Sequence, residues 1–142
     1  MRAIMSEAEI VAFWRAEFPQ VSGEFTLDRL TDDGLVLRMQ VQERHLRPGG
    51  TVSGPAMFGL ADVAFYLALL SRIGPVGLAV TTNIAMDFLR KPMADADLLG
   101  QARLLKVGRS LAVGDVMIFS EGQSEPVARA SLTYAIPPRK QP

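Results

Sequence analysis

Cysteine is missing from the sequence, and histidine occurs only once, at His45. Without cysteine there is no disulfide, no zinc ribbon and no cysteine nucleophile. Because transition-metal sites in proteins draw mainly on cysteine and histidine, a dedicated metal site is not expected either. His45 has no acidic or nucleophilic partner near it in the sequence, so we expect it in a loop or at the surface.

An excess of charge of one sign is missing too. Lys plus Arg and Asp plus Glu each number 15, which gives a formal net charge of zero and no basic footprint for nucleic acid. The first seven residues turn acidic too soon for a signal peptide. The longest apolar run, 56–70, is interrupted by Asp62 and falls short of the ~20 residues of a membrane span. We expect no nucleic-acid partner, no membrane association and a cytoplasmic location.

The length and composition indicate one ordinary globular domain over residues 1–142. Apolar residues make up 49% of the 142 residues and charged residues 21%, which is enough apolar material for a core and argues against disorder. The first 20 residues hold a predicted helix, 7–18, which Ser6 and Glu9 begin as a capping box and Pro19 ends. The segment 137–142 is expected to be a flexible tail.

Two strands, a long helix and four more strands are predicted after this first helix. Period-two alternation indicates a hairpin over 25–42 around an Asp-Gly turn. The glycine-rich loop 43–53 leads into a helix over 54–72. Further strands are expected at 79–88, 98–107, 111–120 and 127–136. Because most strand connections are short, we expect an α+β fold in which an antiparallel sheet of about six strands packs against helices on one face.

Asp62 is the residue that fits this fold least easily. The helix 54–72 is apolar all round for about four turns and should be buried on nearly every side. An unpaired charge buried there would cost several kcal/mol, so Asp62 needs a hydrogen-bonding partner or a cavity that admits water. One interpretation is a functional carboxylate, since such groups cluster at active sites. The other is a structural aspartate bound to the backbone or to Thr or Asn side chains.

The start of the same helix is a second candidate. A helix N-terminus offers free N–H groups to an oxyanion or a carbonyl oxygen, and Gly54 lets a ligand approach the backbone closely. Pro55 removes one donor, which leaves the N–H groups of Gly54 and Ala56. Ser53 is expected to cap the helix. The loop could equally be a plain connection between strand and helix.

Four cations close to strand ends form a third, weaker candidate. As a cluster they could meet phosphate groups, although solvated strand ends are the better explanation of any one of them alone. These residues are Arg90, Lys91, Lys106 and Arg109.

The layout resembles the hotdog fold, and within it the PaaI-like acyl-CoA thioesterases. The segment HLRPGGTVSGPAMFGLADVAFYLAL (45–69) is similar to the family pattern H-x-N-x-x-G-x-x-H-G-G-x-x-x-x-L-x-D-x-A. The segments VTTNIAMDFLRKP (80–92) and LLKVGRSLAVGDVMIFSEGQSEPVARASLTYAI (104–136) resemble its later strands. The residues that agree with the pattern are His45, Gly50, Gly54, Leu60, Asp62 and Ala64.

This resemblance implies a curved sheet wrapped around the long helix, and a homodimer whose sheets join edge to edge, often paired into a homotetramer. It implies hydrolysis of an acyl-CoA thioester, with Asp62 as general base or nucleophile. The backbone N–H of Gly54 from the other subunit would polarise the carbonyl. No cofactor is implied, because coenzyme A is part of the substrate. The two residues lie about 12 Å apart along one helix, too far to grip one carbonyl within a subunit.

Departures from the pattern mark further residues. Arg47 replaces the family's Asn and is expected to reach the thioester or the phosphates as a cation; the alternative is that it locks Asp62 into an ion pair. Ser53 replaces its His, and Thr81 or Thr82 could replace a hydroxyl residue that falls at Ala79. Phe58 and Phe65 could line a pocket for an aromatic or short to medium acyl chain, and a role in the core explains them equally well. The alternative is an acyl-CoA-binding hotdog protein that has lost catalysis.

Overall fold

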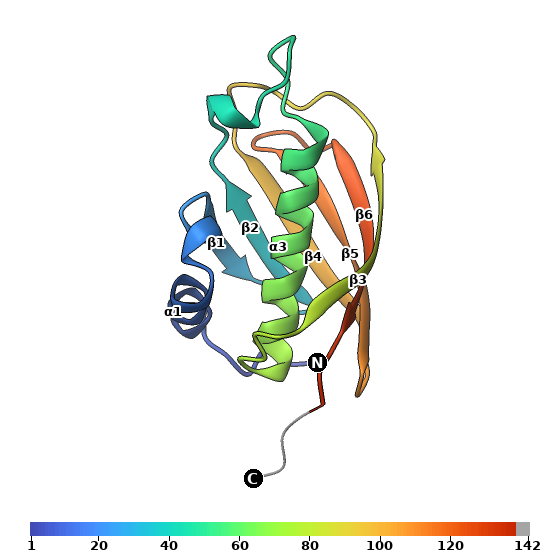
Figure 1. Ribbon diagram of the computed structural model, residues 1–142. Helices are drawn as coiled ribbons and strands as arrows, with labels where there is room; N and C mark the ends of the chain where they lie inside the picture. The colour runs from blue at the N-terminus through green and yellow to red at the C-terminus, as the bar shows by residue number, and fades with distance from the viewer. Residues whose placement is uncertain (139–142) are drawn as a thin grey trace.

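The computed structural model describes residues 1–138 of the chain. The chain forms one sheet, a long central helix and two short N-terminal helices (Figure 1). Of the predicted tail, 137 and 138 have no regular secondary structure, and 139–142 lie outside the described residues.

The N-terminal helix begins at the predicted capping box. The backbone N–H of Glu9 donates to Ser6 Oγ at 3.1 Å, and the N–H of Ser6 donates to Glu9 Oε1 at 3.0 Å. Helix α1 then runs over Glu7–Glu17, one residue shorter than predicted. Pro19 ends it as expected and begins a second, one-turn helix, α2 (Pro19–Ser22).

All six predicted strands are present, and none differs from its expected ends by more than three residues. The sheet is antiparallel throughout, with the order β1-β2-β4-β5-β6-β3. Strand β3, which follows the long helix in the sequence, pairs only with β6 and therefore forms one edge of the sheet. The strands are β1 (Phe25–Leu30), β2 (Gly34–Met39), β3 (Val80–Phe88), β4 (Leu98–Val107), β5 (Leu111–Ser120) and β6 (Ala128–Ala135).

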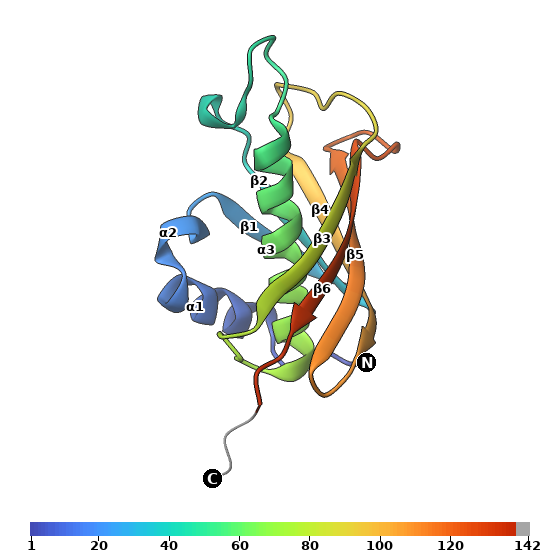
Figure 2. The ribbon, with the colours of Figure 1, turned by 45° about the vertical axis from the view of Figure 1, so that its right-hand side comes forward.

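The long helix α3 (Gly54–Ile73) lies inside the curve of the sheet, with α1 and α2 beside it (Figure 2). Two glycines let it approach the strands closely: a Cβ at Gly100 would come within 3.1 Å of Leu60 Cγ, and one at Gly114 within 2.6 Å of Phe65 Cε2. Its mean hydropathy of 1.6 would suit a membrane span, but the rest of the chain buries 67% of that apolar stretch. This is the predicted hotdog arrangement.

A buried arginine fastens the C-terminal end of α3 to the first hairpin. The guanidinium of Arg72 donates to the carbonyl oxygens of Thr31 at 2.7 Å and Gly34 at 3.1 Å. Burial lowers the pKa of Arg72, and the nearby carboxylates of Asp33 and Asp32 act in the opposite direction. This anchor fixes the helix axis relative to β1 and β2.

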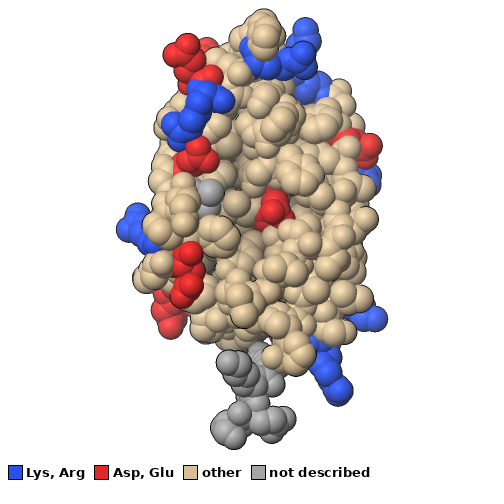
Figure 3. Space-filling view, viewed as in Figure 1, with Lys and Arg blue, Asp and Glu red and all other residues tan. Residues whose placement is uncertain are grey.

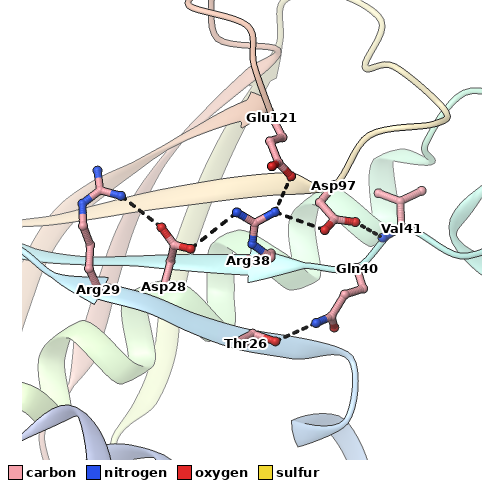
Figure 4. Close-up of polar contacts among 8 residues, drawn as sticks. All are labelled: Thr26, Asp28, Arg29, Arg38, Gln40, Val41, Asp97 and Glu121. Atoms are coloured by element: carbon pink, nitrogen blue, oxygen red, sulfur yellow. Dashed lines mark hydrogen bonds and ion pairs between the residues drawn. The ribbon is translucent and has the colours of Figure 1, made fainter.

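A cluster around Arg38 ties strands together on the other face of the sheet (Figure 4). Arg38 contacts Glu121, lies 3.1 Å from Asp97 Oδ2 and 3.5 Å from Asp28 Oδ1. The bond to Glu121 is the main cause that raises the pKa of Arg38. Since Arg38 alternates with Leu37, which is buried against α3, the cluster lies on the face of the sheet that α3 does not cover.

Candidate active site

One side of α3 is open in its N-terminal half, contrary to the prediction of burial on nearly every side. Five residues at helical spacing along this side are exposed or half-buried, and Asp62 is the acidic one among them. Figure 3 shows an acidic patch at the centre of a face that is otherwise uncharged around it. The five residues are Pro55, Phe58, Gly59, Asp62 and Val63.

Two hydroxyl groups hold the carboxylate of Asp62. Thr81 Oγ1 donates to Asp62 Oδ1 at 2.6 Å, and the hydroxyl of Tyr134 donates to the same oxygen at 2.7 Å. The three side chains come from α3, β3 and β6. Asp62 is therefore a half-buried carboxylate with partners, which meets the requirement set by its place in an apolar helix.

The strand register explains why these two hydroxyls meet at one oxygen. Thr81 of β3 lies directly opposite Tyr134 of β6. A register shift between Thr81 and Asn83 then takes Thr82 out of line, and its hydroxyl donates to the carbonyl oxygen of Thr133 at 3.2 Å. Thr81 is thus at the site, whereas in one chain the hydroxyl of Thr82 bonds to the backbone of β6 and not to Asp62.

Tyr134 is buried, with 3% of its surface exposed. Burial, and after it the charge of Asp62, raise the pKa of Tyr134 far above its usual value. The phenol therefore keeps its proton across the range in which proteins work, and it remains a donor to Asp62. Its ring packs 5.2 Å from the ring of Phe65.

Asp62 opens into a pocket of about 430 Å3, which we call the acid pocket. Its wall is mainly apolar and aromatic, and part of it comes from α1 and the residue after it. The hydroxyl of Tyr66 donates to the carbonyl oxygen of Gly77 at 3.3 Å, and burial raises the pKa of Tyr66. The lining residues are Trp14, Phe18, Asp62, Val63, Tyr66, Gly77, Ala79, Val80, Thr81 and Tyr134.

Gly54 opens into a different pocket of about 720 Å3, which we call the glycine pocket. Ser53 caps α3 as predicted, because its Oγ accepts from the N–H of Ala56 at 3.2 Å. Of the two candidate donors, the N–H of Ala56 is therefore already used by this cap. The N–H of Gly54 has no acceptor within residues 1–138 and is the free donor at the helix start.

The glycine pocket also gathers three of the predicted cations. Arg47, Arg90 and Lys91 line it together with Phe88 and Leu89. Figure 3 shows basic side chains at this end of the molecule. Arg90 also pairs with Glu125 at 3.4 Å. In the described part of the chain Arg47 forms no ion pair, so it does not hold Asp62 within one subunit.

The other two cations lie elsewhere. Lys106 lines a hollow beside Arg72, and Arg109 lines one beside Ile73, both at the C-terminal end of α3. The predicted cluster of four is therefore divided between the two ends of the helix within one chain. The reason is topological, because the β4–β5 turn and the segment after β3 lie at opposite ends of the sheet (Figure 1).

The structure also places three further residues that the sequence analysis discussed. Phe65 is fully buried over Gly114 and lines neither pocket, because it faces the sheet while Asp62 faces outward. Phe58 is 41% exposed on the open side of α3 and lines neither pocket in one chain. His45 is buried, not at the surface: its Nδ1 accepts from the N–H of Gln42 at 3.0 Å inside the loop before α3.

Sequence reasoning missed Tyr134, Trp14 and Phe18 as parts of the site. Tyr134 follows Ala130 and Leu132 at period two on the inner face of β6, so its inward direction was readable from the sequence. The register that brings it opposite Thr81 was not. Trp14 and Phe18 lie at helical spacing in and just after α1, and this spacing indicates an apolar helix face but not that the face borders a pocket.

Comparison with known proteins agrees with the fold. The family model described as "Thioesterase superfamily" matches residues 49–127. A candidate thioesterase from Silicibacter sp. TM1040, known from its crystal structure, is 55% identical, covers 97% of this chain and 96% of its own, and superposes with a TM-score of 0.90. A variant of the phenylacetic acid degradation protein PaaI from Thermus thermophilus is 29% identical, with 82% and 97% covered and a TM-score of 0.70. Human acyl-coenzyme A thioesterase 13 is 27% identical over 117 residues, 82% of each chain.

Proposed function

This chain belongs to the thioesterase superfamily, and from that premise we propose that it hydrolyses acyl-CoA thioesters. The observation that carries the proposal is the way in which the carboxylate of Asp62 is hydrogen-bonded and placed at a pocket. Its carboxylate is held on one oxygen by two hydroxyls and borders an apolar pocket large enough for an acyl group. The name of the human relative, an acyl-coenzyme A thioesterase, points to the same substrate class.

The reaction needs little beyond these groups. A thioester has an electrophilic carbonyl and a good leaving group, so one carboxylate and one or two oxyanion donors suffice. In the proposed reaction Asp62 takes a proton from water as the water oxygen attacks the carbonyl carbon, or attacks that carbon itself to form an anhydride that water then cleaves. The free N–H of Gly54 stabilises the oxyanion. The C–S bond breaks, and the leaving thiolate takes up a proton.

We further propose that the working unit is a homodimer, with Asp62 and Gly54 in each site supplied by different subunits. Within one chain the two residues open into separate pockets with no lining residue in common. Both the open side of α3 and the edge strand β3 are uncovered, and an edge strand presents unpaired backbone groups. A two-fold axis perpendicular to β3 would pair the two β3 strands antiparallel, cover both features and bring the acid pocket of one subunit to the glycine pocket of the other.

In this arrangement the acyl group would occupy the acid pocket and the coenzyme would extend over the glycine pocket. Aromatic side chains and a volume of about 430 Å3 favour an aromatic or a short to medium acyl chain. Arg47, Arg90 and Lys91 are the cations available to the phosphates.

A panel of acyl-CoA substrates tests the proposal directly. Because the chain contains no cysteine, a thiol-reactive dye reports only the coenzyme A that is released. We expect turnover with one group of acyl chains, and a kcat lower by roughly 10² to 10⁴ with Asp62→Asn. Tight binding of acyl-CoA by calorimetry without release of thiol would instead indicate the alternative, a binding protein without catalysis.

A further inference from the structure

We propose that Tyr134 and Thr81 are positioning residues, which hold Oδ1 of Asp62 and thereby assign the reacting role to Oδ2. The inference deepens the proposed function, and its catalytic part rests on that function. Tyr134 lies on β6, outside the sequence motif that contains Asp62.

The hydrogen bonds to Asp62 support this assignment, because both hydroxyls donate to the same carboxylate oxygen. Tyr134 lies 2.7 Å from Asp62 Oδ1 and 3.2 Å from the Asp62 carbonyl oxygen. A phenol has one proton, and the shorter distance places it on Oδ1. The hydroxyl of Thr81 donates its proton to the same oxygen at 2.6 Å. Oδ1 therefore receives two donors.

Oδ2 is left open. Within residues 1–138 no donor reaches Oδ2. The only side-chain polar atom in these residues that is both buried and without a hydrogen-bond partner is Nε2 of His45, so Oδ2 is not buried. Oδ2 is consequently accessible from the acid pocket, which Asp62 lines. A carboxylate with one oxygen pinned and the other facing a pocket cannot exchange the two by rotation without breaking two hydrogen bonds.

The support for Oδ1 is rigid. Tyr134 lies with its ring 5.2 Å from that of Phe65 and 6.3 Å from that of Tyr66. Thr81 is fixed by the β3–β6 pairing directly opposite Tyr134. A reacting atom held in this way needs no reordering before the reaction, which is the advantage that positioning gives a catalyst.

Oδ2 accepts a proton from water while the water oxygen bonds to the thioester carbon. The tetrahedral intermediate then expels the thiolate as the C–S bond breaks, and the proton held on Oδ2 passes to the sulfur. If the carboxylate attacks directly, Oδ2 is again the atom that forms the new bond, and Oδ1 becomes the carbonyl oxygen of the anhydride.

Removal of each hydroxyl tests the assignment. We expect Tyr134→Phe and Thr81→Val each to lower kcat by roughly 10-fold, and the double variant by about 100-fold, with little change in KM. Thr81→Ser keeps the donor and should retain kcat within about 3-fold, which a role in packing alone would not predict. Thr82→Val is the matched control, because its hydroxyl bonds to Thr133 and not to Asp62.

Infrared spectroscopy supplies a readout that does not depend on activity. The difference between wild type and Asp62→Asn at neutral pH isolates the carboxylate bands of Asp62. Unequal bonding of the two oxygens widens the spacing between the antisymmetric and symmetric stretches. We expect this spacing to narrow in the double variant Tyr134→Phe/Thr81→Val and to stay unchanged in Thr82→Val.

The two readouts separate the possible failures. A narrowed spacing in a protein that hydrolyses no acyl-CoA would support the positioning and reject the proposed function. An active wild type whose kcat and carboxylate bands are unaffected by loss of both hydroxyls would overturn the positioning and leave the function in place. Circular dichroism of each variant establishes that the fold is retained.

Discussion

Gly54 and Asp62 lie eight residues apart on the same helix, and they open into two different pockets. The helix separates them by about 12 Å along its axis. Gly54 has the free donor at the helix start, whereas Asp62 has the paired carboxylate in its middle. In a single subunit the proposed base, Asp62, and the proposed oxyanion donor, Gly54, therefore lie in two separate places.

Asp62→Asn is expected to lower kcat by roughly 10² to 10⁴ while the fold and substrate binding are retained. The amide oxygen can still accept from Thr81 and Tyr134, but the side chain cannot take a proton or attack a carbonyl. Steady-state kinetics and calorimetry with acyl-CoA provide the measurement. The matched control is Asp87→Asn, which changes an exposed acid on β3 whose partner is Arg129. Near-normal turnover in Asp62→Asn would remove this residue from the mechanism.

Phe18→Ala is expected to shift the substrate preference toward longer acyl chains. Phe18 lines the acid pocket and meets Tyr66 edge-on, with ring centroids 5.9 Å apart. Its removal enlarges the pocket without touching Asp62. The measurement is the ratio of kcat/KM for a long and a short acyl-CoA, so that any general loss of activity cancels. An unchanged ratio would place the acyl chain elsewhere.

Charge reversal in the glycine pocket is expected to weaken substrate binding. The pair Arg90→Glu and Lys91→Glu should raise KM by about 10-fold or more with little effect on kcat, because phosphate contacts are equal in ground and transition states. The same changes at Lys106 and Arg109 should matter much less, since these residues lie at the other end of α3. The opposite ranking of the two pairs would contradict the proposed path of the coenzyme.

Ser53→Ala is expected to cost about 1 kcal/mol of unfolding free energy and to leave turnover largely intact. The hydroxyl of Ser53 accepts from the N–H of Ala56 and caps α3. Chemical denaturation measures the stability, and kinetics on the folded variant measure the activity. Complete loss of turnover in a folded protein would point to the serine as a nucleophile.

Much of this fold could be predicted because its signals are local. The capping box at Ser6 and Glu9, the cap at Ser53 and the alternation of the strands each act over a few residues, and all are present in the structure. Asp62 was identifiable for a related reason, since one carboxylate in an apolar helix conflicts with its surroundings.

The rest depends on contacts between distant segments. The register that places Thr81 opposite Tyr134, and the shift that turns Thr82 away, are set by pairing across some fifty residues of sequence. The burial of His45 follows from how its loop folds back on itself. Phe65 was misplaced because in an apolar helix the composition does not tell which face meets the sheet.

The central claim is that each site joins Asp62 of one subunit to Gly54 of another, and a hybrid dimer tests it most directly. Gly54→Pro removes the donor at a position where a helix tolerates proline, and Gly54→Ala is its control because it keeps the N–H while adding a Cβ beside Phe88. The two inactive variants, Asp62→Asn and Gly54→Pro, are co-expressed with different tags, and the hybrid is purified. One of its two sites is then intact, so we predict about half of the wild-type activity. A hybrid as inactive as either parent, isolated as a folded dimer, would contradict the claim.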